Sequence, residues 1–138
     1  MEKIVIGFIP AYIAFITFLG VYMFRRRAGA LRAGQIPAGY FKTYQGEVPR
    51  ELKVIQNCFE NQFQVPILFF VTCLAAVLLG VANSLMIRLG FTFFASRLWH
   101  AYIHLGSNSL RLRPLAYAMG LIVLIGMWAV ILIQGQAQ

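Results

Sequence analysis

Three long stretches without a charged residue dominate the pattern of hydrophobic and polar positions. They run from Ile4 to Phe24, from Asn61 to Ile87 and from Pro114 to Gln134. A helix that crosses a bilayer needs about 20 predominantly apolar residues, so each stretch is long enough to span a membrane. A fourth apolar stretch, Leu85 to Leu105, is interrupted only by two arginines and two histidines.

The four stretches predict an all-α membrane protein, a four-helix transmembrane bundle that forms a single domain over residues 1–138. We expect helices at about 4–25, 49–80, 84–110 and 114–134. Pro66 lies inside the second helix and is expected to kink it or to cap its polar part. The loop between the first two helices is rich in glycine, which predicts irregular structure there.

Composition agrees with a membrane protein, and the charge distribution predicts its orientation. Of the 138 residues, 60% are hydrophobic and 12% are charged, against about 25% charged in an average soluble domain. The net charge of +8 lies mainly in the two loops on one side of the predicted bundle. The positive-inside rule makes these loops cytoplasmic and leaves both termini outside the cytoplasm. The same distribution argues against nucleic-acid binding, whereas a basic rim would attract anionic lipid or an anionic solute.

Polar residues form a stripe on the third predicted helix. The residues Arg97, His100, His104, Asn108 and Arg111 are spaced +3, +4, +4 and +3. At about 100° per residue they fall within roughly 80° of arc on one helix face. Ionisable groups at membrane depth are costly and usually mark a cavity, a ligand or a partner helix. This stripe is therefore the first candidate for a functional site.

Another polar stripe lies on the second predicted helix. It contains Lys53, Asn57, Glu60, Asn61 and Gln64, which occupy roughly 100° of arc. The two helices form a hairpin, so we expect the stripes to face each other at the cytoplasmic end. Together they contain more cations than carboxylates, which predicts a pocket for a small anionic ligand. The alternative is a self-satisfied polar network that fixes helix packing.

Two other chemistries have less support in the sequence. His100 and His104, spaced i and i+4, have the spacing to ligate a metal or a haem, but no third ligand of the right kind lies nearby, so we predict no metal site. The chain has no glycine-rich phosphate loop, no paired carboxylates and no Ser/His/Asp arrangement, so hydrolase chemistry has no support.

Two segments resemble the MAPEG family, the membrane-associated proteins in eicosanoid and glutathione metabolism. One is Asn61-Gln-Phe-Gln-Val-Pro66-Ile-Leu-Phe-Phe70, and the other runs from Arg97 to Arg113. The segment from Arg97 is most similar to uncharacterised bacterial members, which carry a similar Arg-x-x-His-x-x-x-His-x-x-x-Asn run followed by an arginine. The resemblance implies a homotrimer of four-helix protomers in a bacterial inner membrane. Glutathione would bind between neighbouring subunits as the co-substrate.

The resemblance also implies roles for individual residues. Lys53 and Arg97 would bind the glutathione carboxylates, and Asn57 with Glu60, or Asn61 with Gln64 in a second register, would bind its backbone and amino groups. Arg111, or Arg113 in the bacterial register, would stabilise the thiolate, with His100 where eicosanoid enzymes place a tyrosine. His104 and Asn108 complete the predicted glutathione site.

Two functions are therefore expected from the sequence. The first is a membrane-embedded glutathione-dependent transferase or peroxidase acting on lipophilic electrophiles. The other is a non-catalytic accessory or structural subunit of the same fold, which binds lipid or a partner protein and belongs to a larger membrane complex. Gln64, where bacterial members have a glutamate, cannot form an ion pair with an ammonium group, and this departure bears on catalysis more than on the fold.

Overall fold

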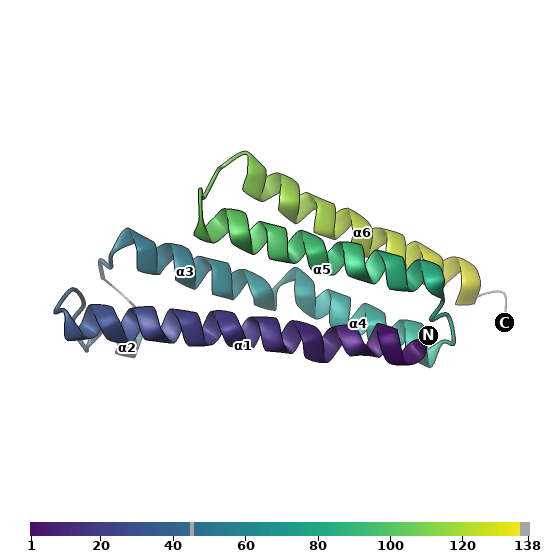
Figure 1. Cartoon of the computed structure of the whole chain (residues 1–138), viewed down its shortest axis with the longest axis horizontal. Helices are drawn as coiled ribbons and strands as arrows, with labels where there is room; N and C mark the ends of the chain where they lie inside the picture. Colours follow the sequence, from purple (N-terminus) through teal and green to yellow (C-terminus); the bar gives the residue numbers. More distant parts are fainter. Residues whose placement is uncertain (45, 136–138) are drawn as a thin grey trace.

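The computed structural model describes residues 1–44 and 46–135, and this part of the chain contains helices and turns but no strand. The elements, drawn in Figure 1, are α1 (Glu2–Arg32), α2 (Tyr40–Thr43), α3 (Arg50–Glu60), η1 (Asn61–Phe63), α4 (Val65–Leu78), α5 (Ser84–Leu105) and α6 (Leu112–Gly135).

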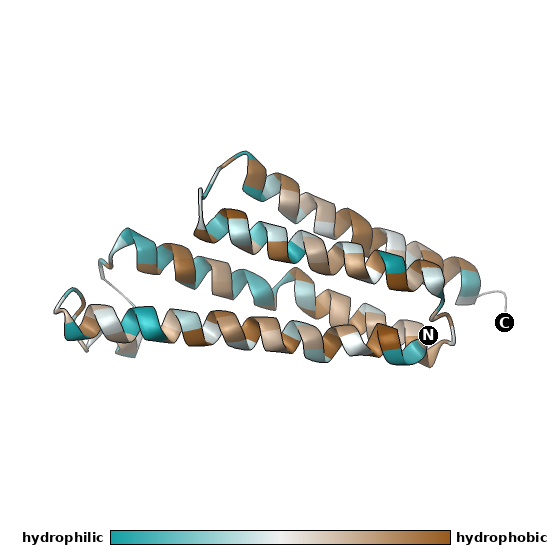
Figure 2. Cartoon of the chain, viewed as in Figure 1, coloured by the Kyte–Doolittle hydropathy of each residue, from teal (hydrophilic) through white to brown (hydrophobic). Residues whose placement is uncertain are grey.

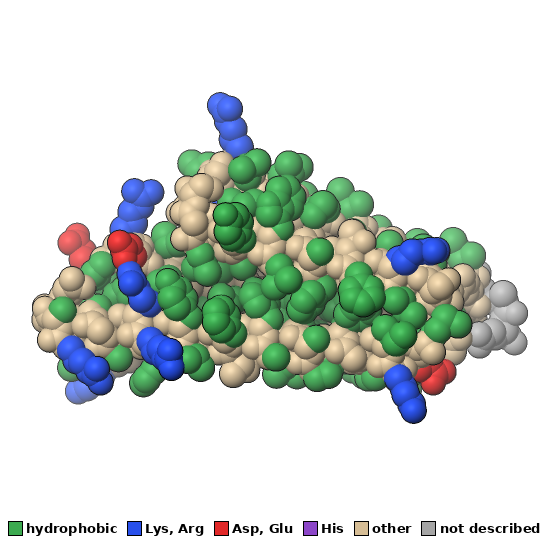
Figure 3. All heavy atoms as spheres, viewed as in Figure 1, with side chains coloured by type: hydrophobic (Ala, Val, Ile, Leu, Met, Phe, Trp, Pro, Cys, Tyr) green, Lys and Arg blue, Asp and Glu red, His purple; other side chains and the backbone are tan. Residues whose placement is uncertain are grey.

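The helices run alternately in opposite directions along one long bundle. Helix α1 packs beside the α3–α4 segment, and α5 packs most extensively against α6 (Figure 1). The beginning of α1 and the end of α6 lie at one end of the bundle, and the long loop after α1 and the turn after α5 lie at the other (Figure 1). Most Lys and Arg side chains visible in Figure 3 gather at the end that carries these two connections. We call the end with the two connections and most of the visible Lys and Arg side chains the basic end, and the opposite end the terminal end.

Three helical segments are long and apolar enough to cross a membrane: Glu2–Arg32, Arg50–Leu78 and Leu112–Gly135. The fourth expected span, α5, has 22 residues but is not among them, since its two arginines and two histidines interrupt its apolar sequence. Hydrophobic residues predominate along the long helices (Figure 2), and the face drawn in Figure 3 is largely apolar. Phe18, Ile122 and Ile133 are each more than 60% exposed. An extended apolar exterior of this kind marks a surface that contacts lipid or another protein.

The second predicted helix is interrupted where the sequence predicts it. Helix α3 ends at Glu60, a 3-10 turn covers Asn61–Phe63, and α4 begins at Val65 with Pro66 in its first turn. Proline has no backbone N–H and its ring clashes with the carbonyl four residues earlier, so a continuous helix is disfavoured here. The side chain of Gln62 links the 3-10 turn to α3, because its Nε2 donates a hydrogen bond to the Cys58 carbonyl at 2.8 Å.

Several helix ends differ from those expected, most of all the ends of α1 and α5. Helix α1 continues to Arg32 instead of ending near residue 25, because the arginines, alanines and leucine that follow the apolar stretch are good helix formers. Helix α5 ends at Leu105 instead of 110, and Asn108 closes its last turn with a positive φ of 49° and a 2.7 Å hydrogen bond from its N–H to the Ile103 carbonyl. Helix α6 begins at Leu112, two residues earlier than expected.

Aromatic side chains fill the core of the terminal half. The rings of Phe69 and Phe93 stack with centroids 4.2 Å apart, and the Phe8 ring packs 5.9 Å from Phe69. Gly90 on α5 admits this packing, since a Cβ added there would lie 2.4 Å from the Phe8 ring. Next to this cluster the buried Tyr12 hydroxyl donates to Gln62 Oε1 at 2.7 Å. The terminal half is therefore closely packed, and its buried Tyr12–Gln62 pair is hydrogen-bonded.

Candidate functional site

The polar stripe of α5 lies inside the bundle. Arg97 is fully buried, and His100 and His104 are 3% and 1% exposed. The guanidinium carbon of Arg97 lies 5.3 Å from the centroid of the Tyr117 ring on α6, and the His100 ring lies 6.0 Å from the same ring. The stripe therefore points toward α6 rather than toward the lipid-facing surface.

A glycine on α6 makes room for this arrangement. A Cβ added at Gly120 would lie 2.9 Å from the Ser96 hydroxyl and 3.5 Å from Cδ of Arg97. Small residues of this kind let membrane helices approach closely. Arg113, Tyr117 and Gly120 are spaced +4 and +3, so helical periodicity places them on one face of α6. That spacing is the signal by which the sequence could have assigned Tyr117 to the site.

The buried arginine and histidine side chains have few hydrogen-bond partners among the described residues. All three guanidinium nitrogens of Arg97 are buried without one, as are Nδ1 of His100, both ring nitrogens of His104 and Nε of Arg113. Leaving a buried donor or acceptor unpaired costs about 1–3 kcal/mol, and more when the group is charged. This cluster of Arg97, His100, His104 and Arg113, here called the buried cationic cluster after its two charged arginines, is thus suited to an anionic or strongly polar ligand.

A cavity of about 190 Å³ opens beside the cluster. It is lined by Asn61, His100, Leu110, Arg113, Pro114 and Tyr117. Nη1 of Arg113 donates to Oδ1 of Asn108 at 2.7 Å, which fixes the direction of the guanidinium. The structure therefore brings together four of the residues expected to bind glutathione or its thiolate: Asn61, His100, Asn108 and Arg113.

The two candidate thiolate cations occupy different environments. Arg113 is half-buried and lines the cavity, whereas Arg111 is exposed and does not. Arg111 also lies beyond the end of α5, so the expected alignment of Arg97 through Arg111 on one helix face is wrong for its last two members. Helix α5 ends at Leu105 with Gly106 as its C-cap, and Asn108 lies in the following turn with a positive φ.

The stripe on helix two does not face the stripe on α5 within one chain, contrary to our expectation. Lys53, Asn57, Glu60 and Gln64 are exposed, and only Asn61 is half-buried and reaches the cavity. The reason is the apolar face of α3, whose buried residues Leu52, Ile55 and Cys58 turn inward and leave the polar face outside. Lys53 and Arg97 therefore do not converge on one carboxylate site within a protomer.

No carboxylate among the described residues forms an ion pair with the buried cationic cluster. Within residues 1–44 and 46–135 the one ion pair joins Arg26 and Glu51 at the basic end. Glu60, the carboxylate expected in the site, accepts a 2.7 Å hydrogen bond from Gln56 on the exposed face of α3. The excess of positive charge that the sequence predicts is therefore present around the cavity.

The two histidines of the cluster lie close to each other. Their rings are 5.7 Å apart with an interplanar angle of 66°. Among the described residues, no group of three or more His, Cys, Asp or Glu side chains converges in a way that would bind a metal ion.

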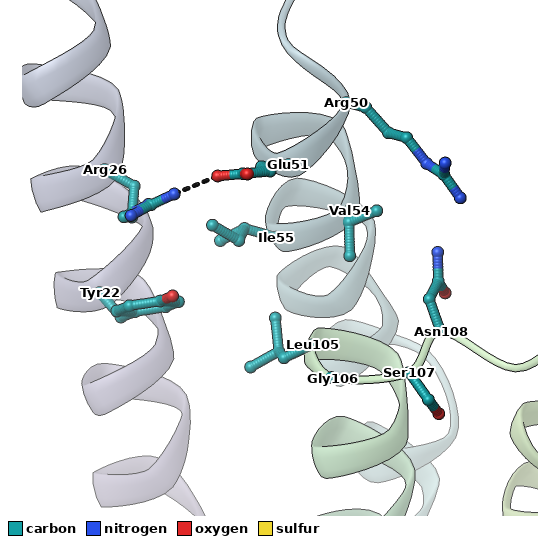
Figure 4. A pocket seen from close by; sticks show the side chains of 10 residues that line it. All are labelled: Tyr22, Arg26, Arg50, Glu51, Val54, Ile55, Leu105, Gly106, Ser107 and Asn108. Carbon is teal, nitrogen blue, oxygen red and sulfur yellow. Dashed lines mark hydrogen bonds and ion pairs between the residues drawn. The ribbon is translucent and has the colours of Figure 1, made fainter.

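A larger cleft of about 340 Å³ lies at the basic end, between α1, α3 and the turn after α5. Figure 4 shows its lining, which includes Tyr22, Arg26, Arg50 and Glu51 as well as Asn108. Asn108 thus contributes to this cleft and, through its bond to Arg113, to the cavity beside His100. From the sequence, Arg50 belongs only to the basic loop. Its place in the lining of the cleft depends on the packing of α3 against α1, which the sequence pattern does not show.

Comparison with known proteins identifies one family. A family model described as MAPEG family matches residues 6–133, which is nearly the whole chain. No curated protein and no solved structure gives a significant match.

Proposed function

The chain belongs to the MAPEG family and is an integral membrane protein, and from this premise we propose that it is a glutathione-dependent transferase or peroxidase for lipophilic electrophiles. Family members include glutathione transferases and proteins without catalytic activity. The observation that carries the proposal is the buried cationic cluster, which has no acidic partner in the described chain and adjoins a cavity.

The chemistry of glutathione fits this excess of positive charge. Glutathione carries two carboxylates, one ammonium group and a thiol, so it is a net anion with one ionisable sulfur. A cavity of about 190 Å³ is smaller than the roughly 300–1,000 Å³ of typical ligand pockets. It therefore suits the cysteinyl part of the tripeptide, while the remainder lies outside it.

Arg113 is the residue assigned to the thiolate. A fixed guanidinium favours the charged form of an adjacent thiol, and the thiolate is the reactive nucleophile. The sulfur would attack an electrophilic carbon and form a C–S bond, while the leaving group departs with the bonding electron pair. With a lipid peroxide, the sulfur would attack one oxygen, the O–O bond would break, and the released alkoxide would take a proton. His100 lines the same cavity and is suited to position the substrate or to donate a hydrogen bond.

The proposal includes a fourth span and a homotrimer. We assign α5 as a membrane span because its 22 residues are enough to cross a bilayer and it packs extensively against α6. The exposed polar face of α3 with Lys53, Asn57 and Glu60 would then contribute to the glutathione site of a neighbouring subunit. The basic end would face the cytoplasm of a bacterial inner membrane, with both termini on the opposite side.

One observation favours a non-catalytic role. Arg97 on α5 packs against the Tyr117 ring and next to Gly120, both on α6. These contacts could hold the two helices together without any ligand. In this second candidate function, the protein is an accessory or structural subunit that binds lipid or a partner protein in a larger membrane complex.

The two arginines near the cavity provide the test. Purified protein in nanodiscs is mixed with glutathione, and formation of the thiolate is followed by its ultraviolet absorbance. We expect Arg113→Ala to abolish the signal and Arg111→Ala, the matched exposed variant two residues away, to keep it. Absence of the signal in the unaltered protein, or its loss only in Arg111→Ala, would contradict the assignment.

A further inference from the structure

The cleft at the basic end has the size and lining of a ligand site separate from the cavity beside His100. Its volume of about 340 Å³ lies within the roughly 300–1,000 Å³ of typical ligand pockets. Val54, Ile55 and Leu105 form an apolar part of its lining, and arginine, serine and asparagine side chains form the polar part (Figure 4). This combination fits a molecule with an apolar body and a polar head.

Two hydrogen-bond donors face each other across the cleft. In Figure 4 the guanidinium of Arg50 and the amide of Asn108 point toward one another. The amide orientation follows from its other contact, because Oδ1 of Asn108 accepts the hydrogen bond from Arg113. Its Nδ2 is therefore the group directed at Arg50. Two donors cannot bond to each other, so the arrangement calls for an acceptor between them.

The acceptor that fits best is an anion. The charge of Arg26 is balanced by its ion pair with Glu51, whereas Arg50 forms no ion pair with the described residues. The cleft therefore carries one uncompensated positive charge. Arg50 is also the first residue of α3, where the helix dipole adds further positive potential.

The position of the cleft indicates the source of this anion. It lies at the basic end of a membrane protein, where Arg25, Arg27 and Arg32 in the last turns of α1 add to the positive charge. Basic residues next to a membrane span attract anionic lipid headgroups. Tyr22 lines the cleft on α1, and tyrosine side chains are enriched at the depth of the headgroups.

We propose that this cleft binds the phosphate of an anionic phospholipid between the Arg50 guanidinium and the Asn108 amide. The glycerol part of the lipid lies against Val54, Ile55 and Leu105. A soluble phosphate compound shares the same recognition chemistry, and the experiment below separates the two sources. The proposal does not depend on glutathione binding, since the cleft and the cavity have different linings apart from the shared contact of Asn108 with Arg113.

The test measures lipid retention by native mass spectrometry. The protein is released from nanodiscs that contain equal amounts of phosphatidylglycerol and phosphatidylcholine, without glutathione. We expect retained phosphatidylglycerol in preference to phosphatidylcholine, and at least a several-fold loss of that retention in Arg50→Gln. The control is Arg32→Gln, which removes an exposed charge at the same end of the bundle but outside the cleft. Equal loss in both variants would show diffuse attraction and overturn the proposal.

A second variant tests the other donor. Asn108→Gly removes the amide and keeps the positive φ that this position requires. We expect it to lose retention as Arg50→Gln does, and normal retention in Asn108→Gly would overturn the two-donor site. In detergent, inorganic phosphate at millimolar concentration serves as the soluble probe. Phosphate binding that Arg50→Gln abolishes, without any phospholipid retained by the unaltered protein, would overturn the lipid assignment.

Discussion

Two regions of the bundle, the aromatic core around Phe69 and Phe93 and the buried cationic cluster, differ in how many of their buried polar groups have hydrogen-bond partners. In the terminal half, aromatic rings interlock around Phe69 and Phe93, and the buried Tyr12 hydroxyl and Gln62 amide are hydrogen-bonded to each other. In the buried cationic cluster, Arg97, His104 and Arg113 have buried polar atoms without a hydrogen-bond partner among the described residues. Close packing stabilises a fold, whereas unpaired buried charge lowers its stability and is retained where it binds something. We therefore expect substitutions in the aromatic core to lower stability, and substitutions in the buried cationic cluster to affect ligand binding.

The largest loss of stability is expected from a substitution at Gly90 in the aromatic core. In Gly90→Val the new side chain would overlap the Phe8 ring, since a Cβ alone would lie 2.4 Å from it. Overpacking of a dense core costs roughly 1–3 kcal/mol, and we expect the upper end of this range. The measurement is thermal unfolding in detergent. The matched control is Gly7→Val on α1, where a Cβ meets nothing within 4 Å; an equal loss in both would contradict the packing account.

A smaller loss is expected from the hydrogen-bonded pair in the same half. Gln62→Leu removes the acceptor of the Tyr12 hydroxyl and leaves that buried group unpaired. The cost is expected to be about 1–2 kcal/mol in chemical unfolding. Gln64→Leu, an exposed position two residues on, serves as the control and should change little. If both variants unfold like the parent protein, the Tyr12–Gln62 bond contributes no stability.

The buried cationic cluster should respond in the opposite way. Arg97→Met replaces a buried charge by an apolar side chain of similar length, so stability without ligand should be unchanged or higher. We expect glutathione to raise the melting temperature of the unaltered protein and to leave that of this variant unchanged. A several-degree drop without ligand would instead assign Arg97 to the structural network. Arg88→Met, at an exposed position on the same helix, controls for removal of a charge.

The smallest effect is expected on the outward face of α3. Lys53 and Asn57 are exposed, and surface substitutions away from special features usually change stability by less than about 0.5 kcal/mol. Lys53→Ala and Asn57→Ala should therefore unfold with the parent protein when the protomer alone is measured. A loss above about 1 kcal/mol in either would place that side chain in an intramolecular contact.

The sequence was sufficient for features that depend on local pattern. Long uncharged stretches predicted the apolar helices, Pro66 predicted the break in helix two, and the MAPEG resemblance is confirmed by the family match. It was not sufficient for the direction of the polar stripes. Periodicity showed that Lys53, Asn57 and Glu60 share a face of their helix, but the packing of the apolar residues on α3 decides that this face points outward.

The candidate site was predicted in part for the same reason. The spacing of Arg97, His100 and His104 identified three members of the buried cationic cluster, because all three lie within α5. The choice between Arg111 and Arg113 depends on where α5 ends and α6 begins. Helical periodicity does not apply to the turn between them, so it does not predict which of the two side chains faces the cavity. Tyr117 could have been assigned from its spacing to Arg113 on α6. Arg50, by contrast, lines its cleft through contacts between helices, which the spacing of residues on one helix does not encode.

The central claim is that an anionic thiol compound satisfies the unpaired cations beside the cavity. Calorimetric titration of the purified protein in nanodiscs with glutathione measures this directly. The account predicts saturable heat with a defined stoichiometry, and its absence when Arg113→Ala is titrated under the same conditions. No heat from the unaltered protein at millimolar glutathione would contradict the account.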